Sequence, residues 1–141
     1  VEHAIAEACT RPMHVDWGGR RRADLYLLTL AEQWSVQHPH IDFTPVLSDS
    51  PVTEYWPGRR GLVHAVAMAD HPRLADYQVY VCGSPGMVTA ARQDFLIHGQ
   101  LPAEEFFADS FDFAADTLAV MSANRALPTS HPSDTGVAPD E

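Results

Sequence analysis

The feature that most constrains the fold is the alternation of short apolar runs with helical patterns along most of the chain. Successive parallel strands need long crossover connections, which helices usually supply. The pattern therefore predicts an α/β domain, with a parallel sheet covered by helices on both faces. Strands are predicted at Met13–Trp17, Ile41–Leu47, Gln78–Cys82 and Glu105–Ala108, and helices at Val1–Cys9, Ala23–His38, Leu62–Asp70 and Pro85–His98.

Length and composition indicate a soluble globular protein with one main domain. The chain has 141 residues, of which 45% are hydrophobic, enough to bury a core. It contains no apolar run long enough to cross a membrane and no signal peptide. The two cysteines lie far apart and lack metal-ligand spacing, so a reducing cytoplasm is the expected location.

The charge distribution excludes some partners. The net charge is −10, and residues 101–141 hold 8 acids against Arg125 alone. This excess of negative charge argues against nucleic acid or an anionic membrane as a partner. All nine cationic side chains are arginine, which excludes a lysine-dependent phosphate loop or a Schiff base.

Residues suited to a nucleotide follow the first two predicted strands. Ligands of open parallel sheets bind beyond the carboxyl ends of the strands. The first strand is followed by "WGGRRRADLY", in which Gly18 lets the backbone approach a ligand and Arg20 offers a forked donor. The second is followed by "LSDS", where Ser48 and Asp49 can hydrogen-bond a ribose. Both strand ends thus carry residues whose chemistry is compatible with a nucleotide.

A third strand end carries the segment "CGSPGM", which begins at Cys82. Its glycines surround a predicted helix start, and the amides of a first helical turn are free to bind a phosphate or a carboxamide. A cysteine is by itself more often a small buried residue than a catalytic one. Three strand ends together predict a nucleotide site.

The five segments "WGGRRRADLY", "TPVLS", "WPGRRGLV", "VYVCGSPGMV" and "FFADSF" stand in the order and spacing of a known family. The chain resembles the NAD(P)-binding domain of ferredoxin reductase-type flavoproteins. Within that family it is most similar to reductase components of oxygenases and to the CDP-6-deoxyglucoseen reductase type. The resemblance covers residues 1–113 and implies a Rossmann-like fold and an enzyme that passes hydride from NAD(P)H to FAD.

The resemblance implies roles for the residues after the third strand. Cys82 would lie beside the nicotinamide ring and shape the hydride transfer by contact, not as a covalent nucleophile. Gly83, Ser84 and Pro85 would line the nicotinamide and pyrophosphate, and Met87 would pack under the turn. Most family members have proline at position 84, so Ser84 is a departure.

The remaining implied contacts lie toward the adenosine and the flavin. Arg20 would face the nucleotide, and Ser48 and Asp49 would face the adenosine ribose. An acid at position 49 disfavours a 2′-phosphate, and thus favours NADH over NADPH, whereas Arg21 and Arg22 favour the opposite. Phe111, in the closing "ADSF" segment, would lie near the flavin.

One departure from the family concerns the start of the domain. Family members open with a buried central strand and a glycine-rich loop, and the sequence from Val1 shows neither. We therefore expect a C-terminal fragment whose sheet lacks its central strand in the order 3-2-1-4-5, with a partial NAD(P)-binding domain at 1–113 and a disordered tail at 114–141. The flavin-binding domain, and any 2Fe-2S domain, would lie elsewhere in the parent chain.

Two function classes remain open. The first is a flavoprotein oxidoreductase that delivers electrons to an acceptor such as a ferredoxin or an oxygenase component. The second is a truncated, non-catalytic nucleotide-binding or interaction module. No metal site is expected, because the two histidines of "HPH" at 38–40 lack a third ligand at a suitable spacing.

Overall fold

Residues 1–111 are described by the computed structural model, and helices alternate with strands along them as the sequence predicts. The helices are α1 (Glu2–Ala6), α2 (Leu28–Gln37), α3 (Val63–Asp70) and α4 (Pro85–Gln93), and the strands are β1 (Met13–Gly19), β2 (Ile41–Leu47), β3 (Arg59–Arg60), β4 (Val79–Gly83) and β5 (Phe106–Ser110). The predicted tail at 114–141 lies outside the described residues.

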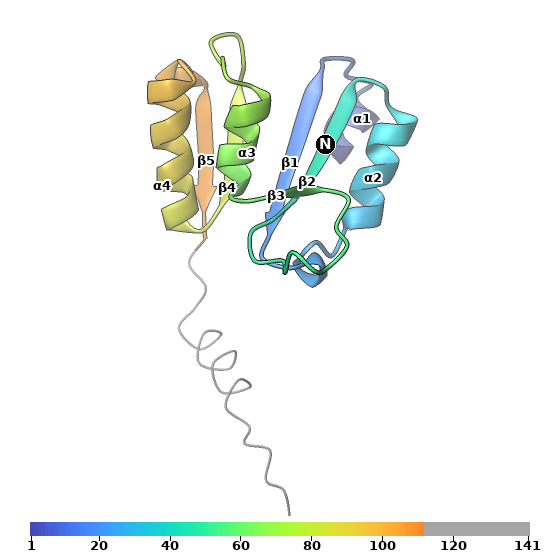
Figure 1. The fold of residues 1–141 in the computed structure, drawn as a ribbon. Helices are drawn as coiled ribbons and strands as arrows, with labels where there is room; N and C mark the ends of the chain where they lie inside the picture. Colours follow the sequence, from blue (N-terminus) through green and yellow to red (C-terminus); the bar gives the residue numbers. More distant parts are fainter. Residues whose placement is uncertain (112–141) are drawn as a thin grey trace, which may run out of the picture. The chain divides into compact units, whose positions relative to one another are not determined.

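The strands form two parallel sheets, which Figure 1 shows as separate groups of arrows. One sheet has the order β1-β2-β3, with Met13 opposite Ile41 and Gly19 opposite Leu47. The other pairs β4 with β5, from Val79 opposite Phe106 onward. The predicted α/β class with parallel strands is confirmed. Within residues 1–111, β1 and β4 each have one edge without a strand partner, and the missing central strand remains a prediction.

Each sheet has buried apolar residues of its own. On the sheet β1-β2-β3, the side chains of Ile41, Val46 and Leu47 are almost completely buried. On the sheet β4-β5, a cluster of buried residues packs the sheet against α4, against the turn that follows α4 and against the segments that precede β4 and β5. Its members are Leu74, Ala91, Phe95, Leu101 and Phe106. Helix α3 contacts β1, β2 and α4, so it links the two sheets by side-chain packing.

The predicted helix over Ala23–His38 is shorter in the structure. A separate 3-10 turn covers Arg22–Asp24, and α2 begins only at Leu28. The cause is Asp24, whose carboxylate accepts hydrogen bonds from the backbone N–H groups of Arg20 and Arg21, both at 2.9 Å. Because these bonds satisfy the two amides that follow β1, they hold a tight turn there, and α2 begins only after that turn.

Two other predicted helices also differ at their ends. The first was expected over Val1–Cys9, but α1 ends at Ala6, and Ala8 has a left-handed backbone with a φ of 53°. The helix expected over Pro85–His98 is continuous, but its last turn, Asp94–His98, is π-helical. Wider turns of this kind are recognised from hydrogen bonds and leave little trace in the hydrophobic period.

The segment between β2 and α3, for which the sequence predicts no helix or strand, contains the short strand β3. Its two residues pair with Val46 and Leu47 of β2. Pro45 fits within β2 because this pairing begins only after it, so the second side of the strand is free at that position. Gly61 follows β3 with a φ of 127°, a conformation that favours glycine, and its N–H donates to the Leu47 carbonyl at 2.9 Å.

Candidate functional site

Gly18 stands near the carboxyl end of β1, where it was expected to give a ligand access to the backbone. The structure shows a close approach by protein atoms at this position. A Cβ built on Gly18 would lie 2.7 Å from the Cβ of Val63, the first residue of α3. Glycine is thus needed here so that helix α3 can pack against β1, and this need does not depend on a ligand.

The loops that follow β1 and β2 are bonded to each other. The Ser48 N–H donates to the Gly19 carbonyl and the Asp49 N–H to the Arg20 carbonyl, both at 2.9 Å. An Arg20 guanidinium nitrogen lies 3.7 Å from an Asp49 carboxylate oxygen, and both side chains are mostly exposed. The structure therefore brings together the three polar residues expected at these strand ends. An ion pair this exposed contributes little stability, so its groups can exchange it for a ligand at small cost.

The loop between β2 and β3 is held in place by hydrogen bonds from two side chains, Arg60 and Trp56. The Arg60 guanidinium donates to the carbonyls of Ser50 and Glu54, at 2.9 and 2.7 Å. The Trp56 indole N–H donates to the Arg59 carbonyl at 2.9 Å. Because one planar guanidinium donates a hydrogen bond to each of these two carbonyls, it fixes both ends of the segment 50–54.

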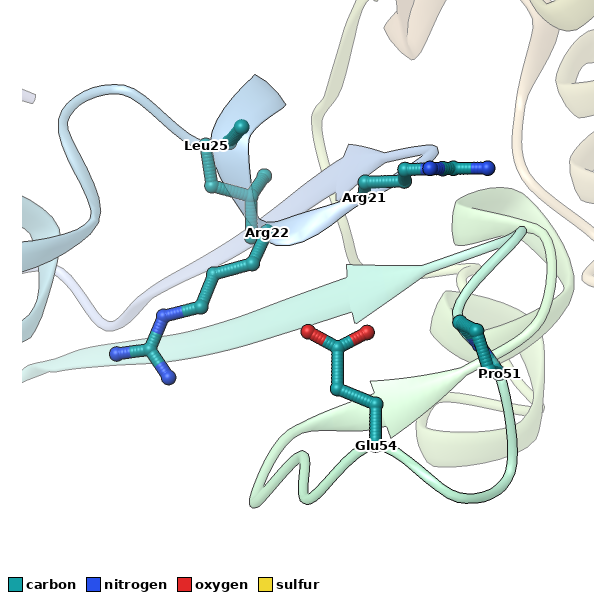
Figure 2. Close-up of a pocket in the computed structure, with 6 residues that line it drawn as sticks. Arg21, Arg22, Leu25, Pro51 and Glu54 are labelled. Carbon is teal, nitrogen blue, oxygen red and sulfur yellow. The ribbon is translucent and has the colours of Figure 1, made fainter.

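This loop forms one wall of a hollow of about 650 Å³ at the same edge of the sheet, shown in Figure 2. The hollow is lined by Arg21, Arg22, Ala23, Leu25, Pro51 and Glu54. In Figure 2 the Glu54 carboxylate points from its loop toward the segment that carries Arg22 and Leu25. Sequence reasoning missed Glu54, since the only local signal is Ser50, four residues earlier, whose hydroxyl donates to the Glu54 carboxylate at 3.0 Å.

At the end of β4, the residues of "CGSPGM" form a strand-to-helix turn. Cys82 is exposed, and Gly83 ends the strand. Ser84 is the N-cap of α4 and accepts a hydrogen bond from the Met87 N–H at 3.4 Å, and Pro85 takes the first helical position. A Cβ on Gly83 would meet the terminal methyl of Met87, so Met87 covers this turn closely.

The first turn of α4 has fewer free amides than the sequence suggested. Pro85 has no N–H, the Met87 N–H bonds to the Ser84 side chain, and the Val88 N–H donates to the Ser84 carbonyl at 2.9 Å. Among the residues described, the Gly86 N–H is the donor of this turn that has no partner. An anion at this helix end would therefore meet one amide and the positive end of the helix dipole.

A larger hollow, of about 970 Å³, lies between β1 and β4. Gly18 and Cys82 both line it, so it reaches the carboxyl ends of both strands. Its walls also include apolar side chains from the two edge strands and from α3, such as Val15, Val81 and Ala67. Within residues 1–111, Gly18 of the first group of predicted site residues and Cys82 and Met87 of the second border this same hollow.

Polar side chains also face this hollow. Burial raises the pKa of Asp16 above its ordinary value of 3.8, and the neighbouring Asp70 acts in the same direction, whereas His71, His14 and Arg59 oppose the shift. The rings of His14 and His71 lie 4.3 Å apart between centroids. The buried ring of His64 approaches Asp94 at 3.5 Å through Nε2, and its Nδ1 has no hydrogen-bond partner within residues 1–111.

Two of the remaining expectations concern Phe111 and metals. Phe111 is 53% exposed and belongs to the C-terminal unit, 111–141, so its predicted place near a flavin stays a prediction. Over residues 1–111, no group of three or more His, Cys, Asp or Glu side chains is arranged to hold a metal ion. In the same part of the chain, no helix combines the length and the apolar character that a membrane crossing requires.

Parallel strands that end in glycine and polar loops, with a capped helix after β4, define a dinucleotide-binding type of α/β domain. Residues 1–93 match the family model described as the oxidoreductase NAD-binding domain. The chain belongs to this family, and the resemblance inferred from the sequence is confirmed.

Three similar proteins carry names that bear on function. The chain is 40% identical over 111 residues to the CDP-6-deoxy-L-threo-D-glycero-4-hexulose-3-dehydrase reductase of Yersinia pestis, covering 79% of this chain and 32% of the relative. It is 35% identical over 113 residues to the NAD(P)H-flavin reductase of Aliivibrio fischeri, covering 80% and 47%. The crystal structure of the Amycolatopsis cytochrome P450 reductase GcoB matches with a TM-score of 0.68 and 29% identity, covering 78% and 32%. The chain thus spans between a third and a half of these proteins.

Proposed function

We propose that this chain binds NAD(P)H across its strand ends and forms the nucleotide-binding part of a flavin-dependent reductase. The observation that carries the proposal is the placement of two residue groups at the carboxyl ends of parallel strands, with Gly18 of β1 and Cys82 of β4 lining one hollow. Arg20, Ser48 and Asp49 form the group on the sheet β1-β2-β3, and Cys82 to Met87 form the group after β4. A dinucleotide has two halves that need such separate sites.

The group after β4 suits the nicotinamide half. Cys82 is exposed at the strand end, and the close contact between Gly83 and Met87 holds the turn on which it stands. FAD, when bound by another domain, would accept the hydride that the nicotinamide carries. Cys82 positions the ring for that transfer by contact, and the Gly86 N–H and the dipole of α4 favour a phosphate beside it.

The group on the other sheet suits the adenosine half. The Asp49 carboxylate can accept hydrogen bonds from the two ribose hydroxyls. In NADPH a phosphate replaces the 2′-hydroxyl, and its negative charge would be repelled by this carboxylate. In the structure Arg20 lies 3.7 Å from Asp49, so a 2′-phosphate would have to compete with this carboxylate for the arginine. NADH is therefore the favoured cofactor of this proposal.

The proposed electron acceptor is a ferredoxin-like or oxygenase component. A 2Fe-2S centre would carry the electrons to it. The support is that similar proteins are named reductases of a dehydrase, of flavin and of a cytochrome P450. The flavin-binding domain of the same parent chain and a cytoplasmic location belong to the proposal as well. The domain division, with the NAD(P)-binding part at 1–113 and a tail from 114, is proposed on the same basis.

We also propose that a strand from the rest of the parent protein fills the hollow between β1 and β4. Both bordering strands present an unpaired edge in residues 1–111, and both run in parallel sheets. A strand inserted there would pair its backbone with both edges and bury the apolar walls. His64 also lines this hollow, and its buried Nδ1 has no hydrogen-bond partner within residues 1–111.

A titration of the 141-residue chain with NADH tests the proposal, followed through the fluorescence of its three tryptophans. We expect saturable quenching that ADP-ribose competes away, because ADP-ribose occupies the adenosine half. We also expect no NADH oxidation above background when FAD is added to this chain, since the flavin site lies in another domain. Absence of any saturable change would refute nucleotide binding and leave the non-catalytic interaction module. Turnover at the rate of an intact reductase would refute the need for a second domain.

A further inference from the structure

We propose that the hollow of Figure 2 selects the base of the bound nucleotide, with Glu54 accepting a hydrogen bond from the exocyclic amine of adenine. This inference rests on the proposed function, because it names the part of NADH that lies beyond the adenosine ribose. The hollow is open to solvent and adjoins the loops that carry Arg20 and Asp49.

The lining of the hollow suits a flat aromatic base. Ala23 and Pro51 are exposed and supply most of the apolar surface, whereas Leu25, which is 3% exposed, adds little. Arg22 supplies a planar guanidinium, which stacks well on aromatic rings, and it already lies 5.9 Å from the centroid of the Trp56 ring. This contact links the loop after β1 to the loop after β2, so both walls of the hollow are joined before a ligand arrives.

Glu54 is held in the orientation that the proposal needs. Arg60 fixes its backbone carbonyl, and the Ser50 hydroxyl donates to one of its two carboxylate oxygens at 3.0 Å. The second oxygen remains available as an acceptor. An acceptor positioned in advance loses less entropy when it binds than a free side chain would.

A carboxylate distinguishes the common purines by their position 6. Adenine carries an amino donor there, whereas hypoxanthine and guanine carry a carbonyl acceptor. A donor would bond to Glu54, and a carbonyl oxygen would be repelled by it. The same charge disfavours a phosphate in this hollow, although Arg21 and Arg22 line it.

The expected size of the effect follows from the chemistry of the contact. Hydrogen bonds to charged groups contribute more than neutral ones, but Glu54 is exposed to solvent, which weakens the contact. We therefore expect NADH to bind about tenfold more tightly than its hypoxanthine analogue.

The experiment titrates the 141-residue chain with NADH and with reduced nicotinamide hypoxanthine dinucleotide, using tryptophan fluorescence. The Glu54→Gln variant should bring the two affinities to within about a factor of two, since a carboxamide can both accept from the amine and donate to the carbonyl. The matched control Glu32→Gln changes an exposed glutamate of α2, outside the hollow, and should keep the tenfold ratio.

Each outcome bears on one of the two proposals. Equal binding of both dinucleotides by the unaltered chain, or an unchanged ratio in Glu54→Gln, would overturn base selection and leave the proposed function standing. Tighter binding of NADPH than of NADH, strengthened further in Glu54→Gln, would overturn it too, because the hollow would then hold a phosphate. Failure of both dinucleotides to bind would remove the proposed function and this inference with it.

Discussion

Replacing Gly18 by alanine should destabilise the fold, because the added methyl group has no room. It would lie 2.7 Å from the Cβ of Val63 and 3.0 Å from one of its γ-methyl groups. A Cβ cannot swing aside as the end of a long side chain can, so β1 and α3 have to move apart. Overpacking of this kind typically costs about 1–3 kcal/mol.

The chain offers a matched control with the opposite sign. Gly86 lies exposed in the first turn of α4, and a Cβ there meets nothing within 4 Å. Alanine is favoured over glycine in a helix by about 0.5–1 kcal/mol, so Gly86→Ala should stabilise the protein or leave it unchanged. Both substitutions are glycine to alanine, and the contrast therefore reports packing and not composition.

Urea unfolding followed by circular dichroism measures the effect. We expect a lower midpoint for Gly18→Ala at an unchanged m-value, and an equal or higher midpoint for Gly86→Ala. The double variant Gly18→Ala/Val63→Gly removes all the clashing atoms of Val63 and should lose less than the sum of its single changes. If Gly18→Ala proves as stable as the original chain, the close packing of α3 on β1 is wrong. If it is destabilised but the double variant is strictly additive, the cost arises elsewhere.

Three further predictions concern the site and its surroundings. In the parent protein, Cys82→Ala should lower the rate of hydride transfer more than it weakens nucleotide binding, and equal losses in stopped-flow reduction and in Kd would reject its role. Asp49→Ser should raise the use of NADPH relative to NADH in steady-state kinetics, and an unchanged ratio would exclude Asp49 as the discriminating residue. Because burial raises the pKa of Asp16, its ionised form destabilises the fold, and this penalty is relieved as the pH falls through the raised pKa. Asp16→Asn should therefore stabilise the chain at neutral pH, by an amount that shrinks toward pH 3.8 in urea titrations; a gain independent of pH would contradict this cause.

The fold class and the strand positions followed from the sequence because apolar runs and helical periods are local signals. Strand β4 was expected over Gln78–Cys82 and runs over Val79–Gly83. Strand β3 was missed because its two residues are both arginine, and they pair only because β2 lies beside them. The break between the 3-10 turn and α2 depends on the bonds from Asp24 to the preceding loop, which no period of apolar residues records.

The candidate site was predictable in part for the same reason. Arg20 and Asp49 were each expected at a strand end, since a parallel sheet gathers its carboxyl ends at one edge. That they face each other at 3.7 Å depends on the register between β1 and β2, which the sequence does not record. Glu54 was not predicted, because its place depends on the Arg60 side chain, which bonds to two carbonyls six and ten residues away.

The two halves of the proposed site differ in what fixes their separation. Backbone hydrogen bonds between β1 and β2 fix Arg20 against Asp49, and the pairing of β4 with β5 fixes the turn at Cys82. Between the halves, residues 1–111 provide the packing of α3, a hydrogen bond from Arg11 to Gln78 at 3.0 Å and the walls of a hollow. We therefore expect the proposed adenosine half to bind its part of NADH by itself. Simultaneous contact with the nicotinamide half requires a fixed spacing, and an inserted strand would provide it by pairing with β1 and β4 together.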